Sequence, residues 1–463
     1  MQINFARQAY QSRSLPISAQ RCVNLFAESM PDDAKVPLVL HGTPGLRLFA
    51  TLGAGPIRGL HAKNGVLFAV SGNTAYAVDT TGTGFSKGVV GGSDRLIMAD
   101  NGTQIVAVTT TGDGYIITDF TTVPIADSDF LPASSVAYLD GYFIFSHKDS
   151  GEFFISDISD GLSYDALEFA AAESAPDNLV AAFVDHRELW LFGKTSIEVW
   201  TNTGNATFPF ERVTNAILER GCIAPASIAK EDNTVWWLGD DLVVYRGSGS
   251  GYAPTRVSTH AIEFALQGFS NVADAEGSFY TQEGHKFYVL KIPDEATFVY
   301  DVSTGLWHQR QSYGQNDWAV TKAVHCYNKI FVGDDTNGNI YELDLDYYTD
   351  NGTTIERIAA CPPLWAKSDR AIMSRFEVDF EAGVGLPVGQ GSNPQAVLRW
   401  SDDGGRTWSN ELWTSIGQLG QYRNRAVWRR LGQFRQRIME VSVSDPVKIA
   451  IQGGYADLEM CLN

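Results

Sequence analysis

The feature that most constrains the fold is a repeat of short apolar runs bounded by turn residues. Units begin near residues 55, 93, 134, 177, 222, 278 and 318. In the fourth unit, the apolar runs Leu179–Phe183 and Glu188–Phe192 flank a polar turn, and Ser196–Trp200 alternates polar and apolar residues. Alternation with period two is typical of a strand with one buried face. Several short strands in each unit of about 40 residues predict a β-propeller, a ring of small antiparallel sheets with six or seven blades.

The composition and the repeat together predict an all-β chain in three parts. Aromatic residues make up 12% of the chain and there are 44 glycines, which suits pleated sheets joined by tight turns. Residues 1–54, rich in proline, are predicted to be an extended N-terminal lead-in that crosses the surface, and residues 55–363 the propeller body. Within the body, residues 259–266 are predicted to form a short helix, with Thr259 as its N-cap. Residues 364–463 have the size of a β-sandwich and form a separate C-terminal domain.

The negative charge of the chain is distributed unevenly. The formal net charge is −19, yet residues 364–463 contain 12 Lys and Arg against 11 Asp and Glu, so the first 363 residues carry a charge of −20. An acidic body repels nucleic-acid phosphate, because non-specific DNA binding depends on cationic groups. An acidic surface that serves only solubility is the alternative interpretation.

Motifs for catalysis, metal binding and membrane insertion are missing from the sequence. The five cysteines are scattered without a CxxC pair, which predicts reduced, buried thiols, and the eight histidines show no zinc-binding spacing. There is no phosphate-binding loop and no nucleophile elbow. Residues 1–20 lack the apolar core of a secretory signal, and there is no apolar run of about 18 residues to span a membrane. We therefore expect no enzyme activity, no cofactor, no metal and no membrane span.

The most specific local motif is an Asp-box in the C-terminal domain. In such a motif, carboxylate and hydroxyl groups bind backbone N–H groups of a tight hairpin, glycine permits the turn and tryptophan packs beneath it. Asp-boxes occur in sialidase-like propellers, so a glycan-binding or sialidase-like protein is the alternative function. Because the motif occurs once and outside the repeat, we expect a structural turn. Its residues are Ser401, Asp403, Gly405, Thr407 and Trp408.

The densest basic feature is a row of arginines in the same domain. One interpretation is an interface for phosphate or for an acidic protein surface, including the acidic body of a neighbouring copy. The other is a pair of strands whose arginines bind acidic residues of the domain itself. The row consists of Arg423, Arg425, Arg429, Arg430, Arg435 and Arg437.

Several segments spread over nearly the whole chain resemble the packaged-DNA stabilisation proteins of short-tailed (podovirus-type) bacteriophages, which form the tail hub or nozzle. No single segment decides the resemblance, and their order along the chain is more specific than any one of them. The segments are RCVNLFAE (Arg21–Glu28), GTPGL (Gly42–Leu46), GPIRGL (Gly55–Leu60), SAPDNLVAAF (Ser174–Phe183), FGKTSIEVWTNTG (Phe192–Gly204), RGCIAPAS (Arg220–Ser227), VSTHAIE (Val257–Glu263), WSDDGGRTWS (Trp400–Ser409) and RAVWRRLG (Arg425–Gly432).

The resemblance implies a structural protein of the phage tail, made in the cytoplasm of the host bacterium. It implies a propeller-type body, a β-rich end domain and a homo-hexamer around the tail axis, below the adaptor ring bound to the portal. It further implies attachment of tail fibres or tailspikes, retention of the packaged genome and a conduit for its ejection. Double-stranded DNA is expected to pass through the channel without sequence-specific binding, because an acidic wall offers it few cations. Turnover of sialosides or binding of glycans by a monomer would favour the alternative function.

Overall fold

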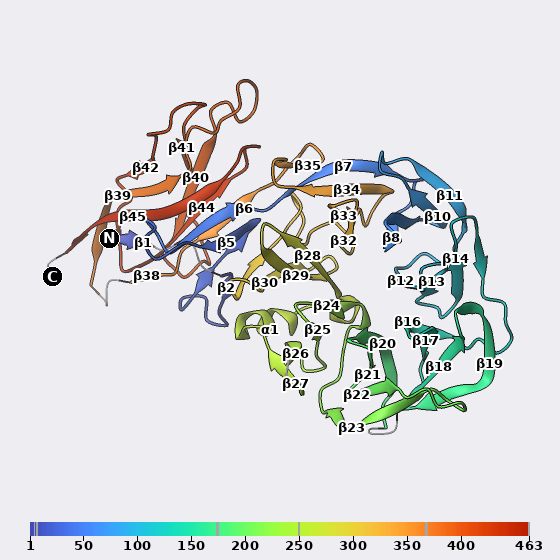
Figure 1. Ribbon diagram of the computed structural model, residues 1–463. Coiled ribbons are helices and arrows are strands. Elements are labelled where there is room, and N and C mark those ends of the chain that lie inside the picture. The colour runs from blue at the N-terminus through green and yellow to red at the C-terminus, as the bar shows by residue number, and fades with distance from the viewer. Residues whose placement is uncertain (4, 6–7, 173–175, 249–250, 366–368, 462–463) are drawn as a thin grey trace.

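A computed structural model of the protein describes residues 1–3, 5, 8–172, 176–248, 251–365 and 369–461 (Figure 1). Within the segments that carry the resemblance, Ser174 and Ala175 lie outside the described residues. A ring of small sheets occupies one side of the molecule, and a pair of larger sheets that contains both chain ends lies beside it. The strands follow the apolar runs of the sequence, and most turns between them contain Gly, Asn or Asp with positive φ.

Five blades of the ring are separate four-stranded sheets in which consecutive strands pair antiparallel. Blade 1 comprises β8 (Ile57–Lys63), β9 (Val66–Ser71), β10 (Thr74–Val78) and β11 (Gly84–Val89). Blade 2 comprises β12 (Leu96–Asp100), β13 (Ile105–Thr109), β14 (Gly114–Ile117) and β15 (Thr122–Pro124). Blade 3 comprises β16 (Ala133–Leu139), β17 (Tyr142–His147), β18 (Glu152–Asp157) and β19 (Asp160–Ala171). Blade 4 comprises β20 (Leu179–Asp185), β21 (Glu188–Gly193), β22 (Ile197–Asn202) and β23 (Phe210–Leu218). Blade 5 comprises β24 (Ala229–Glu231), β25 (Thr234–Leu238), β26 (Val244–Ser248) and β27 (Gly251–Arg256).

Two further blades are parts of larger sheets. Blade 6 comprises β28 (Glu276–Gln282), β29 (His285–Ile292), β30 (Ala296–Asp301) and β31 (Leu306–Gln309). Blade 7 comprises β32 (Val324–Cys326), β33 (Lys329–Gly333), β34 (Asn339–Asp344) and β7 (Gly45–Thr51), and β35 (Thr349–Asp350) and β36 (Thr353–Thr354) extend it. The sequence prediction of a β-propeller is confirmed, and the described residues supply seven four-stranded blades, one for each repeat unit.

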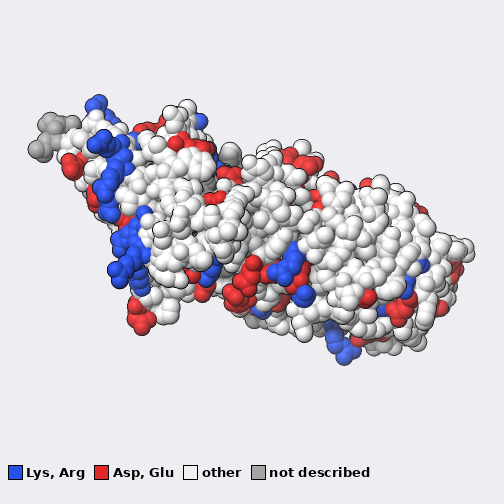
Figure 2. Space-filling view, turned by 90° about the horizontal axis from the view of Figure 1, so that it is seen from above, with Lys and Arg blue, Asp and Glu red and all other residues white. Residues whose placement is uncertain are grey.

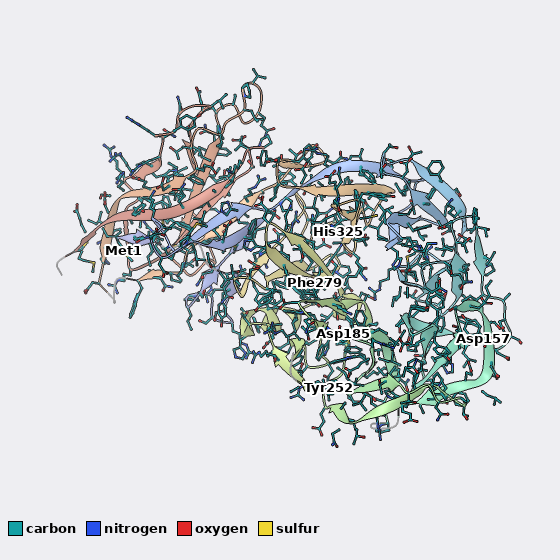
Figure 3. All side chains as sticks on the ribbon, viewed as in Figure 1. Met1, Asp157, Asp185, Tyr252, Phe279 and His325 are labelled. Atoms are coloured by element: carbon teal, nitrogen blue, oxygen red, sulfur yellow. The ribbon has the colours of Figure 1, made fainter. Side chains whose placement is uncertain are left out.

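The blades surround an axis on which the first strands converge, and blades 7, 6, 4 and 3 can be followed in Figure 3 by the labels of His325, Phe279, Asp185 and Asp157. The axis contains a cavity of about 280 Å³, lined by residues of all seven blades or of the segments leading into them. Between blades, apolar side chains interlock; Trp237 of blade 5, for example, packs against Phe192 of blade 4 with 5.7 Å between ring centroids. Burial of such aromatic rings stabilises each pair of neighbouring blades.

Among the described residues, three short helices lie in the connections around blade 5. They are η1 (Pro225–Ser227), α1 (His260–Leu266) and η2 (Val272–Asp274). Ile262 and Leu266 of α1 pack into the apolar cluster that blades 5 and 6 share. Thr259 occupies the N-cap position with extended backbone, but its side chain makes no capping hydrogen bond.

The N-terminal segment is not a separate lead-in. Its described residues form strands in both parts of the molecule: β7 is the fourth strand of blade 7, and four others belong to the sheets beside the ring. Prolines lie at the turns between these strands, so they do not prevent pairing. The remaining strands of the segment are β1 (Gln2–Ile3), β2 (Tyr10–Gln11), β3 (Ala19–Gln20), β4 (Cys22–Val23), β5 (Leu25–Ser29) and β6 (Leu38–Gly42).

The sandwich is built from both ends of the chain, as the N label beside β45 shows (Figure 1). One sheet has the order β42-β39-β45-β6-β5, with β1 and β43 at its sides, and the other contains β4, β37, β44, β40, β41 and β38. Their facing sides form one apolar core that includes Leu25, Leu40, Phe376 and Leu398. The C-terminal strands are β37 (Arg357–Ala360), β38 (Leu364–Trp365), β39 (Ala371–Phe380), β40 (Gln395–Ser401), β41 (Leu412–Ser415), β42 (Ala426–Arg429), β43 (Gln433–Phe434), β44 (Gln436–Val443) and β45 (Ala450–Met460).

The propeller and the sandwich are joined by a continuous sheet. Strand β4 pairs with β31 of blade 6 on one side and with β37 of the sandwich on the other. Next to β4, the buried Asn24 has a φ of 54°, and its Nδ2 donates to the carbonyl oxygens of Gln311 at 3.0 Å and Glu356 at 2.8 Å. A backbone sheet reinforced by such a side chain holds the two domains in a fixed relation.

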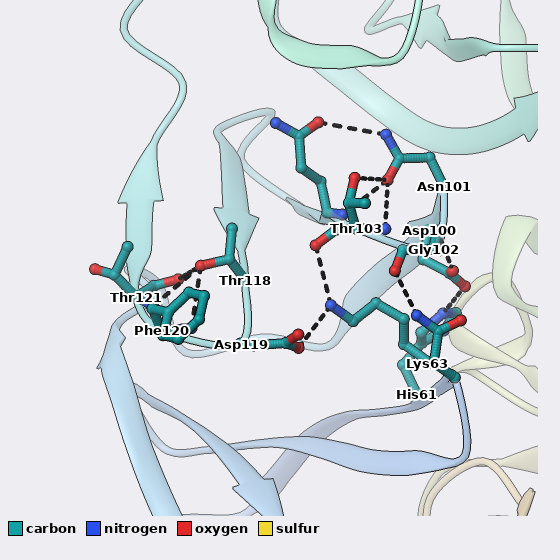
Figure 4. Close-up of polar contacts among 12 residues, drawn as sticks. His61, Lys63, Asp100, Asn101, Gly102, Thr103, Thr118, Asp119, Phe120 and Thr121 are labelled. Carbon is teal, nitrogen blue, oxygen red and sulfur yellow. Dashed lines mark hydrogen bonds and ion pairs between the residues drawn. The ribbon is translucent and has the colours of Figure 1, made fainter.

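Polar contacts also join neighbouring blades, and Figure 4 shows those between blades 1 and 2. Lys63 of β8 is buried, and its Nζ donates to Thr103 O at 3.0 Å and to Asp119 Oδ1 at 2.8 Å. His61 Nε2 lies 2.6 Å from Asp100 Oδ2. Because a buried ammonium group needs hydrogen-bond partners, the Lys63 contact fixes how blade 2 sits against blade 1.

Replacement of Lys63 by methionine tests this contact. Lys63→Met keeps the apolar stem but removes the hydrogen bonds to blade 2, and hydrogen bonds to charged groups contribute about 1.5–3 kcal/mol. We expect a lower free energy of unfolding by about that amount, measured in urea, with the propeller still folded. Lys194→Met is the control, because Lys194 is exposed and its side chain has no ion pair with the described residues. An equal loss in both variants would contradict a specific role for Lys63.

Candidate assembly surface

The arginine row lies along the edge and the loops of the sandwich. Arg423 and Arg425 precede β42, Arg429 ends it, and Arg430 follows with a φ of 60°. Arg435 stands between β43 and β44, and Arg437 is the second residue of β44. The structure thus brings these residues onto one domain, but it gives them two different environments.

Two arginines of the row bind acidic groups of the sandwich, as the second interpretation of the sequence held. Arg437 is buried, and its Nε and Nη2 donate to the two carboxylate oxygens of Asp402, both at 2.7 Å. Arg425 Nη1 donates to Glu377 Oε1 at 2.7 Å, and Glu377 is almost fully buried. Arg437 Nη1 also donates to Leu431 O, so its guanidinium group is used within the sandwich. Arg425 is exposed but already neutralised.

The other four arginines are exposed, and their side chains make no ion pair or hydrogen bond with any described residue. These are Arg423, Arg429, Arg430 and Arg435. Figure 2 shows Lys and Arg side chains gathered in a band over the end of the sandwich, while the rest of that view is mostly uncharged or acidic. Unpaired guanidinium groups at one end of a domain attract acidic surfaces and other anions.

Exposed apolar side chains border the same edge, and the sequence analysis missed them. Trp365 is 69% exposed, Met460 55% and Ile372 40%. Strand pairing places them around Arg435: Trp365 pairs with Gln436, Ile372 with Gln433. We call the surface of Arg429, Arg430, Arg435, Trp365, Ile372 and Met460 the arginine edge. Arginine and tryptophan beside apolar groups are the composition of protein–protein contacts. The feature of the sequence that could have indicated this surface is Trp365, which follows closely after two prolines.

The Asp-box has the hydrogen bonds that its residue types require. Asp403 Oδ1 accepts from the backbone N–H groups of Arg406 and Thr407, both at 2.9 Å, and from the Ser401 hydroxyl at 2.7 Å. The Thr407 hydroxyl donates to Asp403 Oδ2 at 2.6 Å, and this bond is the main cause that holds the pKa of Asp403 well below its ordinary value. Gly405 has a φ of 92°, a conformation that favours glycine.

The Asp-box turn packs on the hairpin of β2 and β3. A Cβ atom on Gly404 would lie 2.7 Å from Cα of Pro16, which shows how closely the two turns approach. The side chain of Trp408 packs with Leu15 and Ala19 of that hairpin, and the guanidinium of Arg399 lies 4.9 Å from the centre of its ring. The motif packs the N-terminal hairpin against the sandwich, and its polar groups form hydrogen bonds within the turn.

The carboxylate of Asp403 makes the turn sensitive to pH. Because its pKa is lowered in the folded protein, ionised Asp403 stabilises the fold above its ordinary pKa of about 4, and this contribution is lost as the pH falls through the folded-state pKa. Asp403→Asn removes the charge and one acceptor. We expect the variant to release the hairpin to a protease at neutral pH and to equal the wild type in strong acid. Unchanged protection at neutral pH would contradict this role.

Metal sites and membrane-spanning helices were also considered among the described residues. Among the described residues, no group of three or more His, Cys, Asp and Glu side chains is placed to hold a metal ion. The helices of the described part are too short and too polar to cross a bilayer. The axial cavity of the propeller is lined by the charged residues Arg95, Glu276, Lys322 and Asp335, among others. One of them, Asp335, forms an ion pair with Lys291 of blade 6.

Comparison with protein families agrees with this architecture. A family profile described as "Bacteriophage P22 Gp10, beta-propeller" matches residues 1–348, and one described as "Bacteriophage P22 Gp10, beta-sandwich" matches residues 356–459. The chain belongs to the Bacteriophage P22 Gp10 family. The propeller profile includes the N-terminal segment, in keeping with strand β7 of blade 7. Members of this family are structural stabilisation proteins of the phage virion, which implies a role without catalysis.

Searches among individual proteins add little. No curated protein matches the chain at a significant level. Among solved structures, the computationally designed Ika8 protein is 14% identical and has a TM-score of 0.41, with 70% of this chain and 99% of that chain covered. The WD40 domain of Pan2 from Neurospora crassa is 8% identical, with a TM-score of 0.42 over 62% of this chain and 89% of that chain. The WD40 β-propeller domain of Doa1 is 13% identical, with a TM-score of 0.43 over 64% and 97%. We base no conclusion on similarities this weak.

Proposed function

We propose that this family member is a subunit of a ring in the phage tail, below the adaptor ring that is bound to the portal. The ring closes the channel through which DNA leaves the head, retains the packaged genome and later forms the conduit for its ejection. The observation that carries the proposal is the division of charge: an exposed, partly apolar arginine edge on the sandwich, and an acidic propeller.

The arginine edge suits a contact with the propeller of the next copy. Arg429, Arg430 and Arg435 offer unpaired guanidinium groups, and Trp365 offers apolar area beside them. The propeller supplies the opposite charge, since residues 45–354 contain 39 Asp and Glu against 18 Lys and Arg. A contact between different surfaces of identical subunits generates a closed ring when the rotation between copies closes. Six copies are the number that the family resemblance favours.

The DNA channel of this proposal lies between copies. The cavity on the propeller axis measures only about 280 Å³ and is lined by residues of all seven blades or of the segments leading into them, so we place the duplex between copies and not within a single propeller. A ring of acidic subunits surrounds DNA with few cations, so that the duplex slides without sequence-specific binding. Retention of the genome then comes from a narrow channel rather than from affinity.

The proposal includes partners above and around the ring. The adaptor and portal complex seats it, and tail fibres or tailspikes attach to its outer surface. The protein is made in the cytoplasm of the host bacterium and ends in the tail of the virion. The rigid junction between propeller and sandwich supports this scaffold role, because the β4 sheet transmits force between the two domains.

Mass measurement in the presence of the adaptor tests the ring. The purified chain is mixed with the adaptor ring of the same phage, and the complexes are weighed by native mass spectrometry and imaged by electron microscopy. We expect six copies per adaptor ring, with the sandwich of one subunit against the propeller of the next. A chain that stays monomeric and does not bind its adaptor would overturn the proposal.

A further inference from the structure

A cluster of buried charge lies behind the turn that connects β6 to β7. Arg310 and Arg357 are 1% and 2% exposed, and neither forms an ion pair with any described residue. Arg310 follows blade 6 and Arg357 begins the sandwich strand β37, so the cluster sits where the two domains meet. Burying a guanidinium group without an anionic partner costs several kcal/mol.

The connecting turn fixes both arginines in place. Arg310 Nη2 donates to Pro44 O at 2.7 Å, and its guanidinium lies 3.5 Å from the ring centre of Trp318. Arg357 runs along the backbone on the other side of the turn, where a Cβ on Gly42 would lie 2.9 Å from Arg357 Nε. Arg310 thus contacts the residue after Thr43, and Arg357 the residue before it. Thr43 itself is buried.

Polar atoms in this cluster lack partners. The described part of the chain offers no hydrogen-bond partner to six of these atoms: Nε and Nη1 of Arg310, Nε and Nη2 of Arg357, the hydroxyl of Thr43 and Oδ1 of Asp350. Asp350 pairs in register with Leu46 of β7, just after this turn, and interacts electrostatically with both arginines. Tyr280 lies near Arg310, but its hydroxyl also lacks a partner with hydrogen-bond geometry. Native proteins rarely leave so many buried groups unsatisfied in one place.

The charges of the cluster do not balance. Two guanidinium groups face a single carboxylate, and burial raises the pKa of Asp350 to about 6 and lowers that of Arg357 to about 10. One further negative charge would balance the cluster. Water alone would supply hydrogen bonds but no charge.

We propose that the cluster binds one small inorganic anion of the chloride class between the guanidinium groups of Arg310 and Arg357. The unpaired N–H groups of the two arginines donate to it, and the Thr43 hydroxyl is a third donor group. A spherical anion accepts from several directions, and burial of the donors favours a small ion over an organic ligand. The anion joins blade 6, the β6–β7 turn and β37, so it stabilises the junction of the two domains.

Anomalous scattering from bromide tests the site in the unaltered protein. Crystals grown with bromide in place of chloride are expected to show a peak within hydrogen-bond distance of Arg310, Arg357 and Thr43. In solution, the midpoint of thermal unfolding is measured in sodium chloride and in sodium gluconate, both at an ionic strength of about 0.15 M. We expect a midpoint that is roughly 2–4 °C higher in chloride, with a saturable dependence on its concentration.

Two variants make the test specific. Thr43→Val keeps the shape of the side chain and removes one donor, so we expect the half-saturating chloride concentration to rise about tenfold. Lys194→Gln removes an exposed cation outside the cluster and the arginine edge, and should leave the chloride dependence unchanged. Equal midpoints in chloride and gluconate would overturn the proposal, as would a bromide peak that is absent from the cluster or present only at molar bromide.

Discussion

Deletion of residues 1–52 is expected to leave a chain that completes neither the propeller nor the sandwich. The deleted strands include β7, the outer strand of blade 7, and β5 and β6 of one sandwich sheet. Leu25 and Leu40 are fully buried in the sandwich core. Loss of one buried leucine side chain costs about 2–5 kcal/mol, and a domain is stable by only about 5–15 kcal/mol. We expect the soluble yield of folded protein to fall at least tenfold, measured by gel filtration and circular dichroism.

A cut at the same place is the control for this deletion. A protease site inserted at the exposed Gly53 and Ala54 leaves all strands present but breaks the chain after β7. Because the N-terminal strands are held by sheet pairing and core packing, we expect the cut protein to remain one folded complex. A deletion variant that unfolds cooperatively at the temperature of the intact protein would show that the N-terminal segment is only an attachment.

Charge reversal at the arginine edge is expected to abolish assembly without unfolding the protein. Arg429→Glu combined with Arg430→Glu changes two exposed side chains that have no partner within the described residues. Such surface changes cost little stability, while like charges brought together in an interface cost several kcal/mol. We expect binding to neighbouring subunits to weaken at least 100-fold, measured by the concentration at which rings form on the adaptor, with the thermal midpoint nearly unchanged.

The matched control reverses the same number of charges on the propeller. Lys87 of blade 1 and Lys194 of blade 4 make no side-chain ion pair with any described residue, so Lys87→Glu with Lys194→Glu alters the net charge equally. If net charge alone governed assembly, both pairs would act alike. Rings that form normally with the arginine-edge variant would exclude this surface from the contact.

The propeller was predictable from the sequence because its contacts are local. Blades 1 to 6 pair strands that follow one another, so apolar runs and turn residues such as those of Leu179–Trp200 show the pattern of a blade. The sequence predicted six or seven blades, and the strand pairing of the described residues gives seven. The Asp-box was equally local, and its hydrogen bonds follow the motif residue by residue.

Long-range pairing was not predictable in the same way. Strand β7 pairs with β34, which is far away in the sequence, and β1 pairs with β45 near the other end of the chain. Two-residue strands such as β4 are too short to show a periodic pattern. The arginine row shows that the sequence alone does not reveal which charged residues are exposed. Spacing did not distinguish Arg437, which binds Asp402 internally, from Arg435 two residues earlier, which is exposed. Only the geometry of the strands separates them.

The central claim, retention of the genome by this protein, is tested most directly in phage particles that lack it. Particles are produced in host cells from a phage without the gene, and their heads are imaged by electron microscopy and assayed for protected DNA over time. The account predicts heads that package DNA and then lose it, with retention restored by the purified wild-type protein and not by the arginine-edge variant. Heads that remain full and stable without the protein would contradict the account.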